Sequence, residues 1–208
     1  MSPLTISYFS CWGFFDLCVG IKKESFGTVI IDICRSLNVN QGLITIFECM
    51  QNSRMGFYAY EGVSEGFVQL RELITQKKIN VIVPSGYIGR PGEIWFARIM
   101  PEPFTELNYG YSVVFTTPYI LSEMQNERFV FSSEKSWDSF FGRNLGKVKT
   151  EDKNRAYELL MKFGLKRHYW NEYIFEGYVN HQDDMIILAG FPDIALSRPH
   201  SKENSERF

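Results

Sequence analysis

The sequence predicts an α+β fold in which an antiparallel β-sheet occupies the first two thirds of the chain. Three short runs rich in Val, Ile, Thr, Phe and Trp, at 79–84, 93–100 and 111–117, each stop at a proline. Gly, Pro and Asn clusters separate them, a pattern typical of consecutive antiparallel strands. We therefore expect a meander or a partly open barrel, packed against an N-terminal helix and a C-terminal group of two to three helices.

The N-terminal helix is predicted from a periodic apolar pattern after Ser25. Side chains recur at steps of three and four residues and so share one helical face: Phe26, Val29, Ile30, Ile33, Cys34 and Leu37. Ser25 is a suitable N-cap, and Asn38 is a suitable end. We expect this face to pack against the core.

Residues 4–21 are ambiguous because they are nearly free of charge and are interrupted by Gly13 and Gly20. Asp16 is the only charged residue between Ile6 and Ile21. The run is shorter than the roughly 20 residues of a membrane span, and no basic residue precedes it as in a secretory signal. We interpret it as one or two buried strands, with membrane association as the less favoured alternative.

The remaining elements follow from local composition. Further strands are expected at 43–47, 56–60, 128–131 and 185–189, with a hairpin turn at 52–55 and either a strand or a short helix at 67–74. Ser133 and Thr150 are suitable helix starts, and another helix is expected at 170–178.

The domain organisation is predicted to be simple. No stretch has the composition of a linker, so we expect a single domain over residues 1–200. A boundary near residue 132, where the helices begin, is the alternative. Residues 201–208 are polar and are expected to form a tail.

Composition and charge narrow the function classes. Of 208 residues, 45% are hydrophobic, 22% charged and 16% aromatic, and we assign the rings mainly to the core. A formal charge of −2 disfavours a protein that coats nucleic acid. We interpret the basic block at 143–167 and the acidic block at 172–206 as surfaces that pair with each other. Phosphate binding by the basic block is the less favoured alternative.

The cysteines indicate a reducing compartment. All four, Cys11, Cys18, Cys34 and Cys49, lie in the first quarter of the chain and lack the spacing of a zinc site. We expect free thiols that act as small buried apolar groups. Together with the absence of a secretory signal, this predicts a cytoplasmic protein.

The loop at 85–92 is the first candidate binding site. Gly86, Gly89 and Gly92 surround Arg90, and glycines permit positive φ and a close approach of the backbone to a ligand. The spacing is not that of a phosphate-binding loop, because a strand follows and no Lys-Ser/Thr pair is present. An ordinary hairpin connection remains the simpler interpretation.

Arg98 extends this candidate site onto the following strand. Alternation places Ile94, Phe96, Arg98 and Met100 on one face, so the guanidinium must face solvent or meet a carboxylate. Tyr87, Arg90, Trp95 and Arg98 are the predicted contact residues. Such a set recognises a peptide or a nucleic-acid end through stacking and bidentate hydrogen bonds.

The C-terminal region holds a second candidate site. On a helix over 170–180, Glu172 and Glu176 share a face, and His181 and Asp184 follow. Glu176, His181 and Asp184 would bind a divalent metal, and with Glu172 they would form the site of a metal-dependent hydrolase acting on a phosphodiester or another anionic substrate. Their spacing fits no known zinc pattern, and ordinary surface ion pairs are the simpler explanation of the cluster.

We therefore favour a non-catalytic interaction or regulatory protein over an enzyme. The preference rests on the absence of a nucleophile elbow and of a dinucleotide-binding turn. The expected partner is a protein or a nucleic acid, with no cofactor and no stable membrane insertion. A divalent metal belongs only to the hydrolase alternative, and the oligomeric state is left open.

Overall fold

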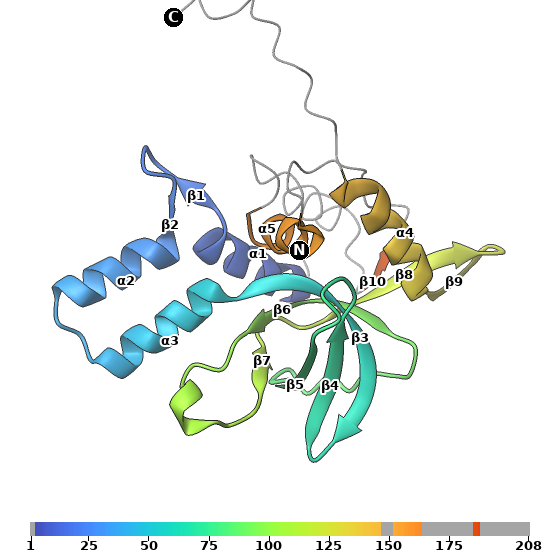
Figure 1. The fold of residues 1–208 in the computed structure, drawn as a ribbon, viewed down its shortest axis with the longest axis horizontal. Helices are drawn as coiled ribbons and strands as arrows, with labels where there is room; N and C mark the ends of the chain where they lie inside the picture. Colours follow the sequence, from blue (N-terminus) through green and yellow to red (C-terminus); the bar gives the residue numbers. More distant parts are fainter. Residues whose placement is uncertain (1–2, 147–151, 164–184, 188–208) are drawn as a thin grey trace, which may run out of the picture.

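The computed structural model describes residues 3–146, 152–163 and 185–187 (Figure 1). These residues form an α+β fold around one large mixed sheet, which confirms the predicted class. The helices are α1 (Pro3–Phe15), α2 (Phe26–Ser36), α3 (Gln41–Asn52), α4 (Glu134–Leu145) and α5 (Lys153–Phe163), with a 3₁₀ turn η1 (Thr105–Leu107). The strands are β1 (Cys18–Val19), β2 (Glu24–Ser25), β3 (Arg54–Ser64), β4 (Phe67–Glu72), β5 (Lys78–Ile82), β6 (Ile94–Met100), β7 (Ser112–Val114), β8 (Tyr119–Gln125), β9 (Arg128–Phe131) and β10 (Met185–Ile187).

Five strands close into a barrel. Strand β6 pairs with β3, β3 with β4, β4 with β5, β5 with β7, and β7 pairs back with β6. The β5–β7 pairing is parallel and the ring is closed, so the prediction of an antiparallel sheet in a meander or a partly open barrel is wrong in these two respects. Strand β8 extends the sheet from β6 and carries β9 and β10 outside the ring.

The three runs that predicted the sheet are indeed strands β5, β6 and β7, and β6 and β7 are antiparallel neighbours, but β5 does not pair with β6. In the closed ring, β7 lies between β5 and β6 on one side, and β4 and the eleven-residue strand β3 lie between them on the other. Composition identifies a strand, whereas its neighbours depend on which strands bury each other's side chains.

Strand β6 is buried on both faces. Trp95, Ala97 and Ile99 point into the barrel, where they meet side chains from all the other barrel strands. Ile94 and Phe96 point outward into a second core that α4 and α5 cover. The predicted alternation along this strand is therefore confirmed.

The outer core joins the C-terminal helices to the sheet through aromatic rings. The ring of Phe57 on β3 lies 4.7 Å from that of Trp137 and 4.9 Å from that of Phe96, measured between centroids. Tyr157 of α5 is fully buried, and its hydroxyl accepts a hydrogen bond of 2.8 Å from the amide of Phe57. Helices α4 and α5 thus share one core with β3 and β6.

Several local predictions are confirmed. Residues 56–60 lie in β3, 67–72 form a strand rather than a helix, and 128–131 form β9. Ser133 caps α4 by accepting a hydrogen bond from the amide of Ser136. The predicted helix start at Thr150, the helix at 170–178 and the tail at 201–208 lie outside the described residues.

Two segments predicted as strands are helices. Residues 4–21 contain α1, which is apolar on all sides: Tyr8 and Trp12 are buried while Ile6 and Phe9 are exposed, so no period marks it. The run at 43–47 lies inside α3, whose packing on α2 outweighs the strand preference of its β-branched residues.

A polar cap and a direct junction define the two ends of α3. Asn40 caps the helix by accepting a 2.9 Å hydrogen bond from the amide of Gly42. The chain then passes directly from α3 into β3 at Ser53, so the predicted hairpin turn at 52–55 is a helix-to-strand junction.

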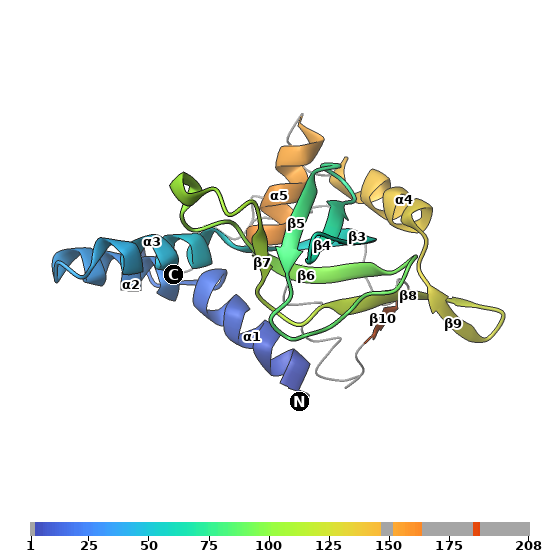
Figure 2. The ribbon, with the colours of Figure 1, turned by 90° about the horizontal axis from the view of Figure 1, so that it is seen from below.

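The molecule has two projections at opposite ends. Helices α2 and α3 lie side by side and form an arm at one end, while the β8–β9 hairpin extends from the other (Figure 2). Across the described segments, every helix falls short of the length and apolar character that crossing a bilayer requires. Cys11, Cys18, Cys34 and Cys49 are free and half-buried, and burial raises the pKa of the Cys11 and Cys49 thiols.

The hydrogen bond between α5 and β3 gives a first prediction. Tyr157→Phe leaves the buried amide of Phe57 without its acceptor, so we expect the free energy of unfolding to fall by about 1–3 kcal/mol in urea titrations. Tyr60→Phe is the control, because the hydroxyl of Tyr60 makes no hydrogen bond within the described residues. Equal stability of the two variants would contradict the contribution assigned to Tyr157.

Candidate interaction surface

The loop between β5 and β6 is anchored by a buried carboxylate. Glu93 is 2% exposed and accepts hydrogen bonds from the Tyr87 hydroxyl at 3.0 Å and from Trp95 Nε1 at 2.8 Å. Burial and the hydrogen bond to Glu93 raise the pKa of Tyr87 to about 12. Two predicted contact residues, Tyr87 and Trp95, are thereby brought together, with Trp95 fully buried in the barrel.

Glycine allows this loop to lie on aromatic rings. A Cβ on Gly89 would lie 2.5 Å from Tyr60 and 2.6 Å from Trp95, so only glycine fits there. The close backbone approach expected of this loop is made to the protein's own side chains. At the loop surface, Ile88 and Arg90 remain exposed.

Arg98, the fourth predicted contact residue, meets a carboxylate in the interior. Its guanidinium pairs with Asp16 at the end of α1, and both side chains are 1% exposed. It also donates to the carbonyl of Ser53 at 2.9 Å. Lys162 of α5 lies 3.0 Å from the other oxygen of Asp16 and donates to Ser53 at 2.7 Å.

This buried cluster ties together parts that are distant in the sequence. Asp16 follows α1, Ser53 joins α3 to β3, Arg98 lies on β6 and Lys162 on α5. Burial, reinforced by the charge of Arg98, lowers the pKa of Lys162 to about 8 although Asp16 acts in the opposite direction. With Trp95 and Arg98 inside, Tyr87 and Arg90 are the predicted contact residues that still reach the surface.

The residues proposed for a metal site, Glu172, Glu176, His181 and Asp184, lie outside the described residues. Within the described ranges, no three His, Cys, Asp or Glu side chains gather closely enough to hold a metal ion. The structure therefore does not test the hydrolase alternative, which stays a prediction from the sequence.

The arm carries several exposed apolar side chains along α2. Helix α2 forms as predicted, with Ser25 accepting from the amide of Thr28, but its apolar face is not buried. Phe26 is 52% exposed, Ile33 51% and Leu37 71%. The prediction that this face packs against the core is therefore wrong. Gly27 and Ile31 are the buried residues of α2.

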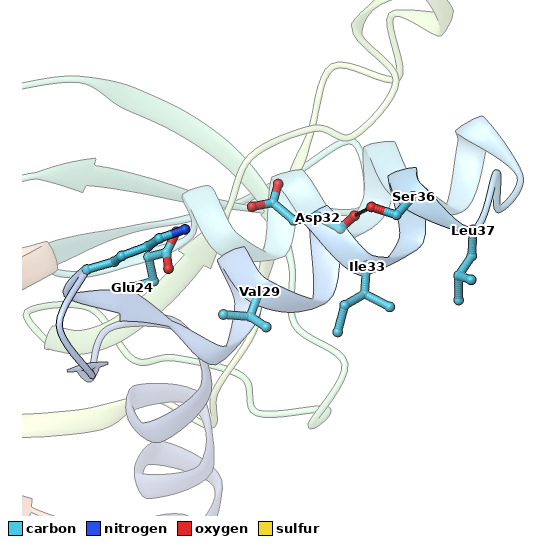
Figure 3. Close-up of a pocket in the computed structure, with 7 residues that line it drawn as sticks. Glu24, Val29, Asp32, Ile33, Ser36 and Leu37 are labelled. Carbon is cyan, nitrogen blue, oxygen red and sulfur yellow. Dashed lines mark hydrogen bonds between the residues drawn. The ribbon is translucent and has the colours of Figure 1, made fainter.

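The exposed side chains of α2 form a continuous row. Figure 3 shows Val29, Ile33 and Leu37 on the same side of the helix, spaced one turn apart. They belong to a shallow groove whose polar members are Lys22, Glu24, Asp32 and Ser36.

A second groove continues this surface toward the body. It is lined by residues of α1, α2 and α3: Ser10, Cys11, Phe14, Phe15, Gly27, Ile30, Phe47 and Met50. Phe14 of α1 is half exposed, and its ring lies 6.2 Å from that of Phe26. We define the helical-arm surface as Phe14, Phe26, Val29, Ile33 and Leu37. It runs from α1 to the tip of the arm.

Comparison with known proteins finds no matching family model, no matching curated protein and no matching solved structure. Functional conclusions therefore rest on the geometry of this chain. The sequence already contained the signal for the helical-arm surface, namely the periodic face after Ser25. What it lacked was any sign that the face is uncovered, since a buried and an exposed apolar stripe have the same period.

The buried position of Lys162 predicts a specific pH dependence. The folded protein releases this proton near pH 8, whereas the unfolded chain holds it to about pH 10.5. Between these values the unfolded state binds more protons, so this lysine's contribution makes stability rise with pH. Relative to Lys162→Met, we expect the free energy of unfolding of wild type to increase by roughly 2–4 kcal/mol from pH 7 to pH 10.5.

Denaturant titrations at several pH values measure this difference. Cys18→Ser is introduced into both proteins because the charge of Lys162 acts on the pKa of that thiol, and the remaining Tyr and Cys titrations are common to both. Lys153→Met, an exposed position on the same helix, should follow wild type throughout. A constant difference between wild type and Lys162→Met across the range would rule out the buried ammonium.

Proposed function

We propose that this chain is a non-catalytic interaction protein that binds a helical segment of a partner protein along the helical-arm surface. The observation that carries the proposal is the exposed row of Phe26, Val29, Ile33 and Leu37 on a projecting arm. Contiguous exposed apolar residues rimmed by polar ones are typical of interaction sites. The apolar character favours a protein partner over a nucleic acid, whose binding depends on basic side chains.

The dimensions of the row fit a helix. Phe26 to Leu37 spans twelve residues, or about 17 Å along the helix axis at roughly 1.5 Å per residue. A partner helix of three to four turns, with apolar residues at i, i+3 or i+4 and i+7, covers this length by the helix-in-groove mode. The partner's apolar side chains would bind in the groove beside the row.

Charge favours a basic flank on the partner and disfavours a second copy of this chain. The groove carries Glu24 and Asp32 against Lys22. Asp32 flanks the row, and its carboxylate pairs with Arg35 at 3.2 Å, so two α2 helices packed about a twofold axis would bring charged side chains, and not only apolar ones, against each other. A Lys or Arg on the partner helix would instead pair with Asp32.

The experiment uses a synthetic amphipathic peptide of about four helical turns, with Leu along one face and Lys on its flanks. Binding is measured by fluorescence anisotropy. We expect Val29→Glu/Ile33→Glu to weaken binding at least about thirtyfold, since it removes about 2 kcal/mol of apolar contact and buries charge. The free energy of unfolding of this double variant should stay within about 0.5 kcal/mol of wild type, because both side chains are exposed.

Val63→Glu is the matched control. Val63 is an exposed apolar residue of β3, away from the arm, and its replacement should leave peptide affinity unchanged. A peptide with Glu in place of Lys should bind wild type more weakly, and Asp32→Lys should restore its binding. Equal affinity of wild type and the double variant would contradict the proposal, as would a dimer in light scattering that Ile33→Glu dissociates.

A further inference from the structure

Strand β9 is an open edge at the end of the molecule opposite the arm (Figure 2). It pairs with β8 on one side, and all four of its residues, Arg128 to Phe131, are exposed. None of the four makes a backbone hydrogen bond on its other side within the described chain. Among the residues that the structure describes, the edge therefore carries donors and acceptors that pair with no other strand.

The register identifies which backbone groups face outward. The hairpin turns through Asn126 and Glu127, whose φ values of 48° and 62° are those of a two-residue type I′ turn. Such a turn makes Gln125 and Arg128 a hydrogen-bonded pair, and alternation makes Phe129 and Phe131 non-hydrogen-bonded positions. The bond from the amide of Ser132 to the carbonyl of Leu121, at 3.0 Å, agrees with this register.

The amides and carbonyls of Phe129 and Phe131 thus point away from β8 toward the open edge. Their side chains share one face of the hairpin with Met124, which lies directly across from Phe129. All three are at least 40% exposed. The opposite face carries Arg128 and Val130.

Soluble proteins usually protect such an edge with proline, lysine, a bulge or a covering segment. Strand β9 has no proline, lysine or bulge, and its only charged side chain is Arg128. Arg128 forms no ion pair within the described residues. The two nearby acids of the hairpin, Glu123 and Glu127, form no ion pair with it in the part of the chain that the structure describes, and Glu123 accepts a hydrogen bond from Gln125.

We propose that β9 captures an extended peptide, which adds to the sheet as a further strand. The peptide's backbone would pair with the outward groups of Phe129 and Phe131. Its apolar side chains, at alternate positions, would cover Met124, Phe129 and Phe131. A carboxylate on its other face would lie opposite Arg128 and pair with it.

The size of the edge selects a peptide over a second copy of the chain. Four strand residues extend about 13 Å. An edge of this length cannot supply the roughly 800 Å² per partner that a stable interface between two folded proteins buries. A short peptide needs only the backbone ladder and a few side-chain contacts.

The test is selection from a displayed library of random peptides of about seven residues against wild type and against Phe129→Pro. Because the amide of Phe129 points outward, proline removes a donor to the incoming strand and leaves the ladder to β8 intact. Phe129→Ala is the matched control, since it removes the ring and keeps the amide. Circular dichroism verifies that all variants fold.

We expect enriched peptides with alternating apolar residues and a carboxylate, which bind Phe129→Pro at least about tenfold more weakly than Phe129→Ala. Arg128→Glu should reverse the preference from Glu to Lys in the peptide. The double variant Val29→Glu/Ile33→Glu, which alters only the helical-arm surface, should bind these peptides like wild type. Binding at β9 and binding at the arm can therefore fail independently of each other. Enrichment of no peptide, equal binding by Phe129→Pro and Phe129→Ala, or a dimer abolished by Phe129→Pro would each overturn the proposal.

Discussion

The ion pair between Asp16 and Arg98 is the constraint on which the arrangement of the other elements depends. A buried charge is tolerated only when it is paired and hydrogen-bonded, so Arg98 on the barrel requires a carboxylate at the end of α1. The same cluster holds the α3–β3 junction through Ser53 and α5 through Lys162. It therefore sets where the base of the arm and the last described helix meet the barrel.

Strand β6 shows how one element supports both halves of the fold. Trp95, Ala97 and Ile99 fill the barrel, and Ile94 and Phe96 fill the outer core, so the strand is apolar throughout except at Arg98. With its interior filled by Trp95 and its neighbours, the barrel is a packed scaffold. The two surfaces that we propose for binding both lie on elements attached to the barrel, the arm and the β8–β9 hairpin.

The sequence predicted which segments form helices and strands better than it predicted how these pair and pack. The α+β class, the helix after Ser25, the three proline-ended strands and the alternation along β6 follow from local periodicity and turn chemistry. Helix α3 was missed because its β-branched residues favour a strand, and tertiary packing on α2 overrides that preference. The barrel closure was missed because the β5–β7 and β3–β6 pairings join residues far apart in the chain.

For the candidate sites too, the sequence identified the residues but not whether they are buried or exposed. The sequence identified the loop after β5 and the importance of Arg98, but burial turned Trp95 and Arg98 into internal supports. It also identified the apolar face of α2 but wrongly assigned it to the core. Whether such a face is covered depends on the whole fold and cannot be read from its period. Strand β9 was predicted as a strand, and nothing in its four residues indicates that one of its edges stays open.

The placement of the arm and the β8–β9 hairpin at opposite ends has a consequence for how ligands would combine (Figure 2). Two ligands bound there would not compete for space, and the rigid barrel would fix their separation. If both belonged to one complex, capture of the first would raise the effective concentration of the second, and two weak contacts would give tight binding. If they belonged to different molecules, the chain would act as a bridge whose span is set by the barrel.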